Sequence, residues 1–123
     1  MIILRLRPRL QTSCIVPIPS RLDSCGAHHS FAESNEDPKF TVRQLGPWIR
    51  HTHLKDSVGK GVDRKYVLTG RGNVPIKEQI AALRSIDYKG FYCFEWEKVW
   101  HPDLEDPEIA IADYARAVAD YLR

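Results

Sequence analysis

Apolar positions recur at helical spacing in three stretches of the chain. The first begins at Asp37-Pro38, an acidic cap followed by a proline at the first helical position, and ends at Gly46-Pro47. The second begins after Pro75, and the third begins at Asp106-Pro107. The sequence therefore predicts three helices. Their apolar faces are Phe40, Val42 and Leu45, then Ile76, Ile80, Leu83 and Ile86, then Ile111, Tyr114 or Ala115, Val118 and Leu122.

Two short apolar runs between these helices have the pattern of strands. They cover residues 48–54, where apolar residues alternate with histidines, and residues 91–95, which follow a turn. Residues 66–68 predict a further short strand. The polar residues 56–65 include two glycines and predict a surface loop.

The predicted order is helix, strand, helix, strand, helix. Such alternation is typical of parallel strands joined by right-handed crossovers. A chain of 123 residues has room for one domain with a core, but two or three such units cannot close a barrel of eight strands. The expected fold class is therefore a partial α/β domain.

Residues 1–26 have a different composition from the rest of the chain. They contain four arginines and three prolines, but no lysine or glutamate and a single acid, Asp23. No helical or strand period persists there, and prolines interrupt the apolar run 14–16. We expect an irregular segment at 1–26 and the ordered α/β part at 27–123.

The composition restricts the classes of partner. A net charge of +2 predicts neither a nucleic-acid partner nor a membrane partner, and no apolar run approaches the roughly 20 residues of a spanning helix. Cys14, Cys25 and Cys93 share no metal or redox spacing. Free thiols of this kind are typical of a reducing compartment, so we expect a cytoplasmic protein.

His53 and Glu95 stand at the ends of the two predicted main strands. The carboxyl ends of parallel strands are where functional side chains gather in α/β folds. An imidazole with a carboxylate suits Mn, Co, Zn or Fe, and Mg when more oxygen ligands are present. The alternative is that His53 is a hydrogen-bonded core residue and Glu95 caps a loop.

Four neighbouring residues are further candidates. Lys55 is placed to bind a substrate hydroxyl or phosphate. Asp56 is placed to orient a metal-binding side chain without contacting the metal itself. Arg71, between two glycines, is placed to meet an anionic or polyhydroxy substrate, and Glu97 shares a strand face with Glu95. The alternatives are a loop cap for Asp56, a solvated turn for Arg71 and an ion pair for Glu97.

Four blocks resemble the xylose-isomerase-like TIM-barrel superfamily. They are His-x-His-Leu-Lys-Asp-Ser at 51–57, Gly-x-Gly-x-Val-Pro at 70–75, Tyr-Lys-Gly-Phe-Tyr-Cys-Phe-Glu at 88–95, and the tail from Glu95 to about residue 108. The match covers about residues 27–123, in the carboxyl-terminal part of that fold. The resemblance implies a partial TIM (β/α)8 barrel, about its last three strand–helix units.

The resemblance also implies a set of metal ligands. Members bind one divalent metal through a glutamate, an aspartate, a histidine and a second glutamate on four successive strands. His53 matches the histidine and Glu95 the last glutamate. His29 matches the histidine of an Asp-x-x-His block and is expected to bind substrate, but Gly26 stands where the aspartate belongs. The first glutamate would lie upstream of the matching region.

The implied activity is that of a sugar or sugar-phosphate isomerase or epimerase, with a small-molecule sugar as substrate. A divalent metal (Mn, Mg, Co or Zn) assists proton transfer next to a carbonyl, and Glu95 is one of two catalytic carboxylates. Because two of the four ligands are missing, we expect a carboxyl-terminal piece that is inactive alone.

Three alternatives stay open at this point. The first is a non-catalytic fragment or decayed gene product that self-associates through open sheet edges. The second is a polyol dehydratase of the same superfamily. The third is a metal-dependent abasic-site endonuclease, which is disfavoured because the block at 63–65 lacks the required histidine.

The stretch 23–26 suggests an origin for the unusual amino-terminal segment. Family members often read Leu-Leu-Trp-Asp there, and such codons read one base out of frame can give Asp-Ser-Cys-Gly, the sequence of this chain. We therefore expect residues 1–26 to come from a shifted reading frame. The alternative is a natural divergent segment.

Overall fold

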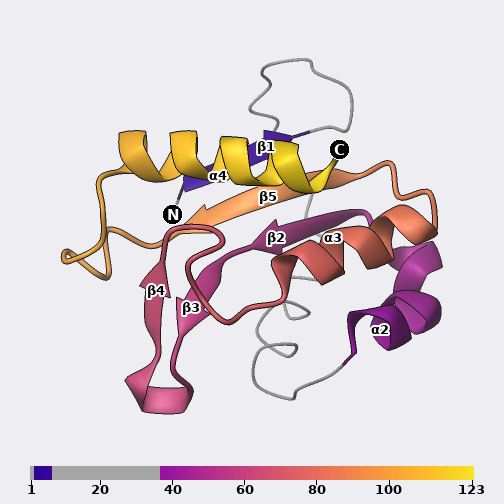
Figure 1. Cartoon of the computed structure of the whole chain (residues 1–123), viewed down its shortest axis with the longest axis horizontal. Coiled ribbons are helices and arrows are strands. Elements are labelled where there is room, and N and C mark those ends of the chain that lie inside the picture. Colours follow the sequence, from indigo (N-terminus) through magenta and orange to yellow (C-terminus); the bar gives the residue numbers. More distant parts are fainter. Residues whose placement is uncertain (1, 7–36) are drawn as a thin grey trace.

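The computed structural model describes residues 2–6 and 37–123, which form a mixed α/β structure (Figure 1). Its strands and helices are β1 (Ile2–Leu6), α2 (Pro38–Leu45), the 3₁₀ helix η2 (Gly46–Trp48), β2 (His51–Leu54), β3 (Asp56–Val58), the 3₁₀ helix η3 (Gly61–Asp63), β4 (Lys65–Val67), α3 (Ile76–Ser85), β5 (Phe91–Trp96) and α4 (Pro107–Tyr121).

The three predicted helices are confirmed. The Asp37 side chain accepts a hydrogen bond from the Lys39 backbone N–H at 2.9 Å, so the capping signal acts as expected at the start of α2. Asp106 lies at the N-cap of α4 but makes no capping hydrogen bond from its side chain. Three residues depart from the predicted apolar faces: Phe40 and Leu45 of α2 are 48% and 46% exposed, and Ile86, the C-cap of α3, is 38% exposed.

The predicted parallel pairing of the two main strands is confirmed, and the sheet contains one further strand, which was not predicted. β2 and β5 are parallel neighbours, but β2 begins at His51 because residues 46–48 form a 3₁₀ turn. β1 pairs antiparallel with the other side of β5, in the order β1-β5-β2. The expectation of an irregular segment at 1–26 was therefore wrong for residues 2–6. Within the described residues the sheet does not close into a barrel.

The prediction of a surface loop at 56–65 is confirmed for the exposed turn at residues 59–63 but wrong for the residues on either side of it, which form strands. β3 and β4 form an antiparallel hairpin, and the strand expected at 66–68 begins one residue earlier. Gly59 and Gly61 have positive φ values at the turn, where glycine is tolerated without strain. Asp56 and Ser57 are buried because the chain supplies hydrogen-bond partners that a local pattern does not reveal.

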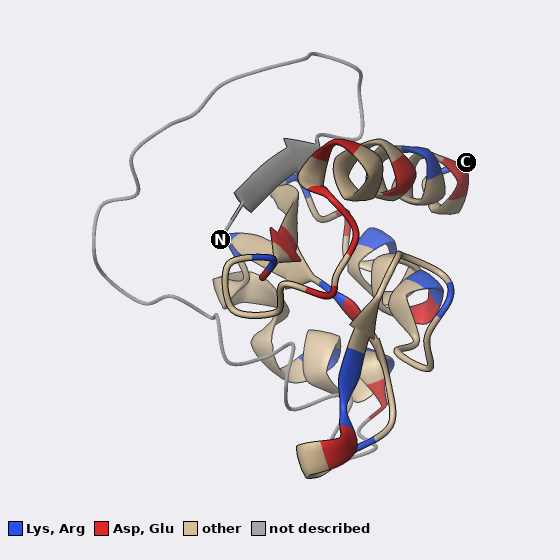
Figure 2. Ribbon diagram, turned by 90° about the vertical axis from the view of Figure 1, so that its left-hand side faces the viewer, with Lys and Arg blue, Asp and Glu red and all other residues tan. Residues whose placement is uncertain are grey.

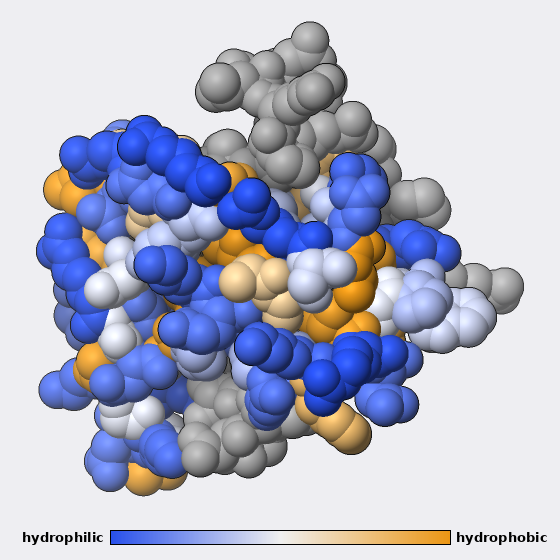
Figure 3. All heavy atoms as spheres, turned by 45° about the vertical axis from the view of Figure 1, so that its right-hand side comes forward, coloured by the Kyte–Doolittle hydropathy of each residue, from blue (hydrophilic) through white to orange (hydrophobic). Residues whose placement is uncertain are grey.

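The main core lies between β5 and the helices. Tyr92, Phe94 and Trp96 alternate along β5 and are at most 1% exposed. The Phe94 ring stacks on Tyr114 of α4, with centroids 4.6 Å apart. Hydrophilic side chains cover much of the surface around this layer, and apolar atoms emerge in a strip between them (Figure 3). Among the described residues, no helix has both the length and the apolar character to cross a bilayer.

Candidate functional site

The parallel register of β2 and β5 brings a set of polar side chains to one face of the sheet. His53 lies opposite Cys93, and because side chains alternate along a strand, Glu95 lies on the same face. Phe94 and Trp96 point to the opposite, helix-covered face. A strand period of two therefore separates polar residues from core residues within a single strand.

Both oxygens of the Glu95 carboxylate face basic groups. Its Oε2 lies 3.5 Å from His53 Nδ1, and its Oε1 lies 3.3 Å from Lys55 Nζ. The hydrogen bond from His53 lowers the pKa of Glu95 most; burial opposes this effect, and the charge of Lys55 adds to it. The result is a pKa of about 2, below the ordinary 4.5. Glu95 is thus a carboxylate anion at neutral pH.

Lys55 is a buried cation, with only 3% of the residue exposed. Its Nζ donates to Glu97 Oε1 at 2.7 Å and lies 4.3 Å from the centre of the Tyr66 ring. Burial by itself lowers the pKa of Lys55. The hydrogen bond to Glu97 and the charge of Glu95 outweigh burial, so the pKa is raised above 10.5.

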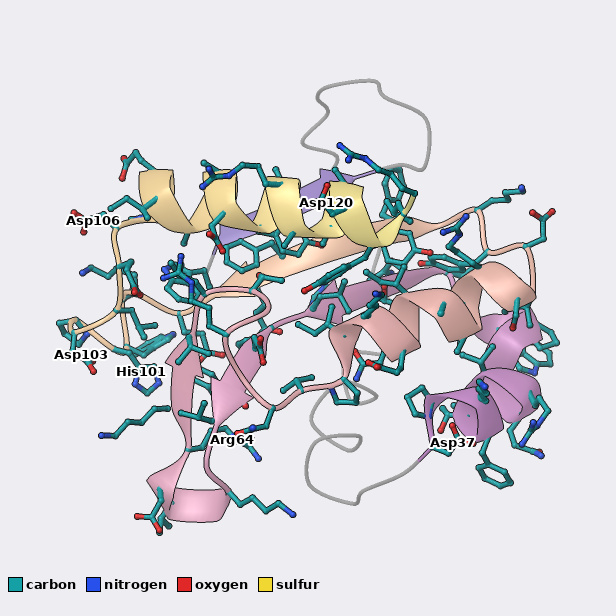
Figure 4. All side chains as sticks on the ribbon, viewed as in Figure 1. Asp37, Arg64, His101, Asp103, Asp106 and Asp120 are labelled. Carbon is teal, nitrogen blue, oxygen red and sulfur yellow. The ribbon has the colours of Figure 1, made fainter. Side chains whose placement is uncertain are left out.

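His101 extends the cluster beyond the sheet. It lies on the segment between β5 and α4, beside β4 (Figure 4). Its Nε2 is 3.6 Å from Glu97 Oε2, and its ring lies nearly perpendicular to the Tyr66 ring, with 5.1 Å between the ring centroids. Tyr66 was not among the candidates from sequence. The available signal was its place at the start of the short strand predicted at residues 66–68. Acidic residues also occupy the segment that leads into α4 (Figure 2).

Asp56 has a different environment from the one expected. Its carboxylate accepts hydrogen bonds from the backbone N–H groups of Ser57, Gly70, Gly72 and Val74, at 2.8–3.3 Å. The residue is 1% exposed. These contacts anchor the glycine-containing loop 70–74 to the start of β3. The carboxylate thus orders the loop that carries Arg71.

Arg71 lies at the surface, with 63% of its side chain exposed. Its Nη2 is 3.4 Å from Asp113 Oδ1 on α4. The structure thus brings His53, Lys55, Glu95 and Glu97 into one cluster and gives Arg71 a partner on a helix instead. His29 and Gly26 lie outside the described residues.

The donor set can be compared with what a metal needs. His53 and Glu95 offer nitrogen and oxygen donors of the kind that Mn, Co and Zn accept. Within residues 2–6 and 37–123, no group of three or more histidine, cysteine, aspartate or glutamate side chains is arranged to hold an ion. The described residues therefore supply two donors of a larger set.

Any role for this cluster has to be argued from its own geometry. Comparisons of the chain with protein families, with curated proteins and with solved structures find no match.

Proposed function

We propose that the cluster is part of the metal site of a sugar or sugar-phosphate isomerase or epimerase, and that the chain carries the last units of a (β/α)8 barrel of the xylose-isomerase-like kind. One observation carries the proposal. Two adjacent parallel strands bring His53 and Glu95 to 3.5 Å from each other, on one face at their carboxyl ends. The proposal includes a cytoplasmic location, in keeping with the free Cys93 thiol.

The chain's own residues suit such a site in their chemistry. Glu95 is ionised at neutral pH and offers a carboxylate to a cation. His53 is the second side chain that can donate an electron pair to a metal ion. Lys55 and Glu97 provide hydrogen-bonding groups for sugar hydroxyls beside it. A bound divalent ion would supply Lewis-acid polarisation of the carbonyl oxygen.

A non-catalytic role is the second candidate, and a specific observation favours it. Lys55 bridges Glu95 and Glu97, so the carboxylates already have a cation between them. In this candidate the lysine and the two carboxylates hold one another in the folded chain without any ligand, and removal of the lysine would leave two partly buried carboxylates uncompensated. This candidate predicts no specific uptake of metal.

Metal binding separates the two candidates. We expect the untagged chain to bind Mn²⁺ or Co²⁺ saturably in titration calorimetry at neutral pH, and we expect Glu95→Gln and His53→Gln to abolish the binding. Glu108→Gln, which changes an exposed glutamate in α4, is the matched control and should bind like the parent. Absence of saturable binding at millimolar metal, both by the parent and by Lys55→Met, which removes the neighbouring positive charge, would contradict the metal site.

Turnover is tested separately. With two of the four donors in the described residues, we expect no exchange of the carbon-bound proton of ketose phosphates in deuterated buffer, followed by proton NMR. Mn²⁺-dependent exchange that disappears in Glu95→Ala would contradict this expectation and would identify an active enzyme.

A further inference from the structure

Lys55 places a positive charge at the position where the proposed function requires a metal ion to approach. Its ammonium is 3.3 Å from Oε1 of Glu95, the same carboxylate whose other oxygen faces His53. A divalent ion bound by His53 and Glu95 would therefore lie within a few ångströms of a full positive charge. At that separation and in a partly buried site, repulsion between cations is strong.

The surroundings of Lys55 offer the ammonium a second position. Glu97 Oε1 is closer to Nζ than Glu95 is, at 2.7 Å, and the Tyr66 ring lies beneath it. A small rotation about the end of the side chain would keep the contact with Glu97 and release Glu95. Lysine suits this exchange because its charge is compact and its stem flexible.

We propose that Lys55 is an internal competitor of the divalent metal: it neutralises Glu95 when no ion is present and withdraws to Glu97 when an ion binds. The inference rests on the proposed function, since it concerns the same pair of donors. Lys55 acts here as a positioning residue. It occupies one oxygen of Glu95 without metal, and it sets how tightly the site binds one.

The experiment compares metal affinity with and without this charge. Lys55→Met keeps the length of the stem and removes the charge, Lys55→Gln removes the charge but keeps hydrogen-bond donors, and Lys55→Arg keeps the charge. Lys60→Met, at the exposed tip of the β3–β4 hairpin, is the matched control for loss of a lysine. Affinity for Mn²⁺ is measured by titration calorimetry at low and at moderate salt.

We expect Mn²⁺ to bind at least about tenfold more tightly to Lys55→Met and Lys55→Gln than to the parent. Lys55→Arg and Lys60→Met should leave the affinity near that of the parent. In thermal unfolding, Lys55→Met should melt lower than the parent in EDTA, and Mn²⁺ should raise its melting temperature more than that of the parent. The melting temperature also reports metal binding by a variant that is only marginally folded, because a bound ion raises it.

The outcomes separate this inference from the proposed function. Equal or weaker binding by both charge-removing variants, with the parent still binding through His53 and Glu95, overturns the competition and leaves the metal site standing. Binding by Lys55→Met but not by the parent supports the competition and shows that the parent is a poor metal site. No binding by any variant overturns both.

Discussion

Two carboxylates in this protein, Asp56 and Glu95, have opposite kinds of partner. Asp56 is almost fully buried and is held by four backbone N–H groups. Glu95 keeps 19% of its side chain exposed and is held by two side chains, His53 and Lys55, that can move or change charge. Backbone partners are fixed by the fold, whereas side-chain partners can be exchanged for a ligand.

The two sets of partners differ in how freely they can change. If Asp56 exchanged its backbone donors for a ligand, the loop at residues 70–74 would lose the hydrogen bonds that hold its conformation. Asp56 is therefore not available to bind a ligand. The partners of Glu95 are side chains, which can rotate away without a change in the backbone. The block around residues 51–57 therefore combines a structural anchor at Asp56 with side chains, His53 and Lys55, whose contacts with Glu95 can be exchanged.

Removal of the anchor should have the largest effect. Asp56→Ala leaves several buried N–H groups without an acceptor, and we expect it to lower the free energy of unfolding by about 3–5 kcal/mol. Urea denaturation followed by tryptophan fluorescence measures the change. Asp63→Ala, at the exposed hairpin turn, should cost less than about 0.5 kcal/mol. A similar loss in both variants would show that the Asp56 hydrogen bonds carry no special weight.

A smaller effect should follow from crowding the anchor while keeping its charge. A Cβ at residue 72 would collide with the Asp56 carboxylate and with the Ser57 carbonyl oxygen. We expect Gly72→Ala to cost about 2–3 kcal/mol, because the loop must shift and lengthen its hydrogen bonds. The neighbouring Asn73→Ala, whose side chain is exposed, serves as the control in the same denaturation experiment. A neutral Gly72→Ala would mean that the loop is freer than the structure indicates.

The smallest effect concerns Glu95 and depends on pH. Its pKa in the folded state, about 2, lies below the ordinary 4.5, so its ion pairs stabilise the fold fully above pH 4.5 and are lost as the pH falls toward 2. After allowance for partial exposure, the contribution is about 2 kcal/mol. The difference in stability between the parent and Glu95→Gln should shrink by this amount from pH 5 to pH 2. A difference that is constant with pH would rule out the lowered pKa as its source.

The sequence predicted the helices well because their signals are local. Asp37 and the proline after it start α2 where the pattern indicated, and Ile80 and Val118 are fully buried on their predicted faces. The predicted neighbours β2 and β5 are parallel because a helical crossover joins them. His53 and Glu95 could be singled out for the same reason.

Other features were beyond any local pattern. Asp56 accepts hydrogen bonds from N–H groups 14 to 18 residues further along the chain, so the start of a polar segment that looked like a loop is the buried end of a hairpin. β1 pairs with β5 across most of the chain length. The apolar residues of β1 stand in a segment without periodicity, so the sequence around them does not indicate that they pair with β5.

The amino-acid sequence by itself determined where helices begin and end and which polar residues interrupt the strands, because caps and periodicity act over a few residues. Only the tertiary structure decided what those polar residues meet. Lys55 lies between Glu95 and Glu97, 40 and 42 positions away, and Asp56 lies within a loop of backbone amides. Contacts of this range depend on strand register and burial, which are properties of the folded chain.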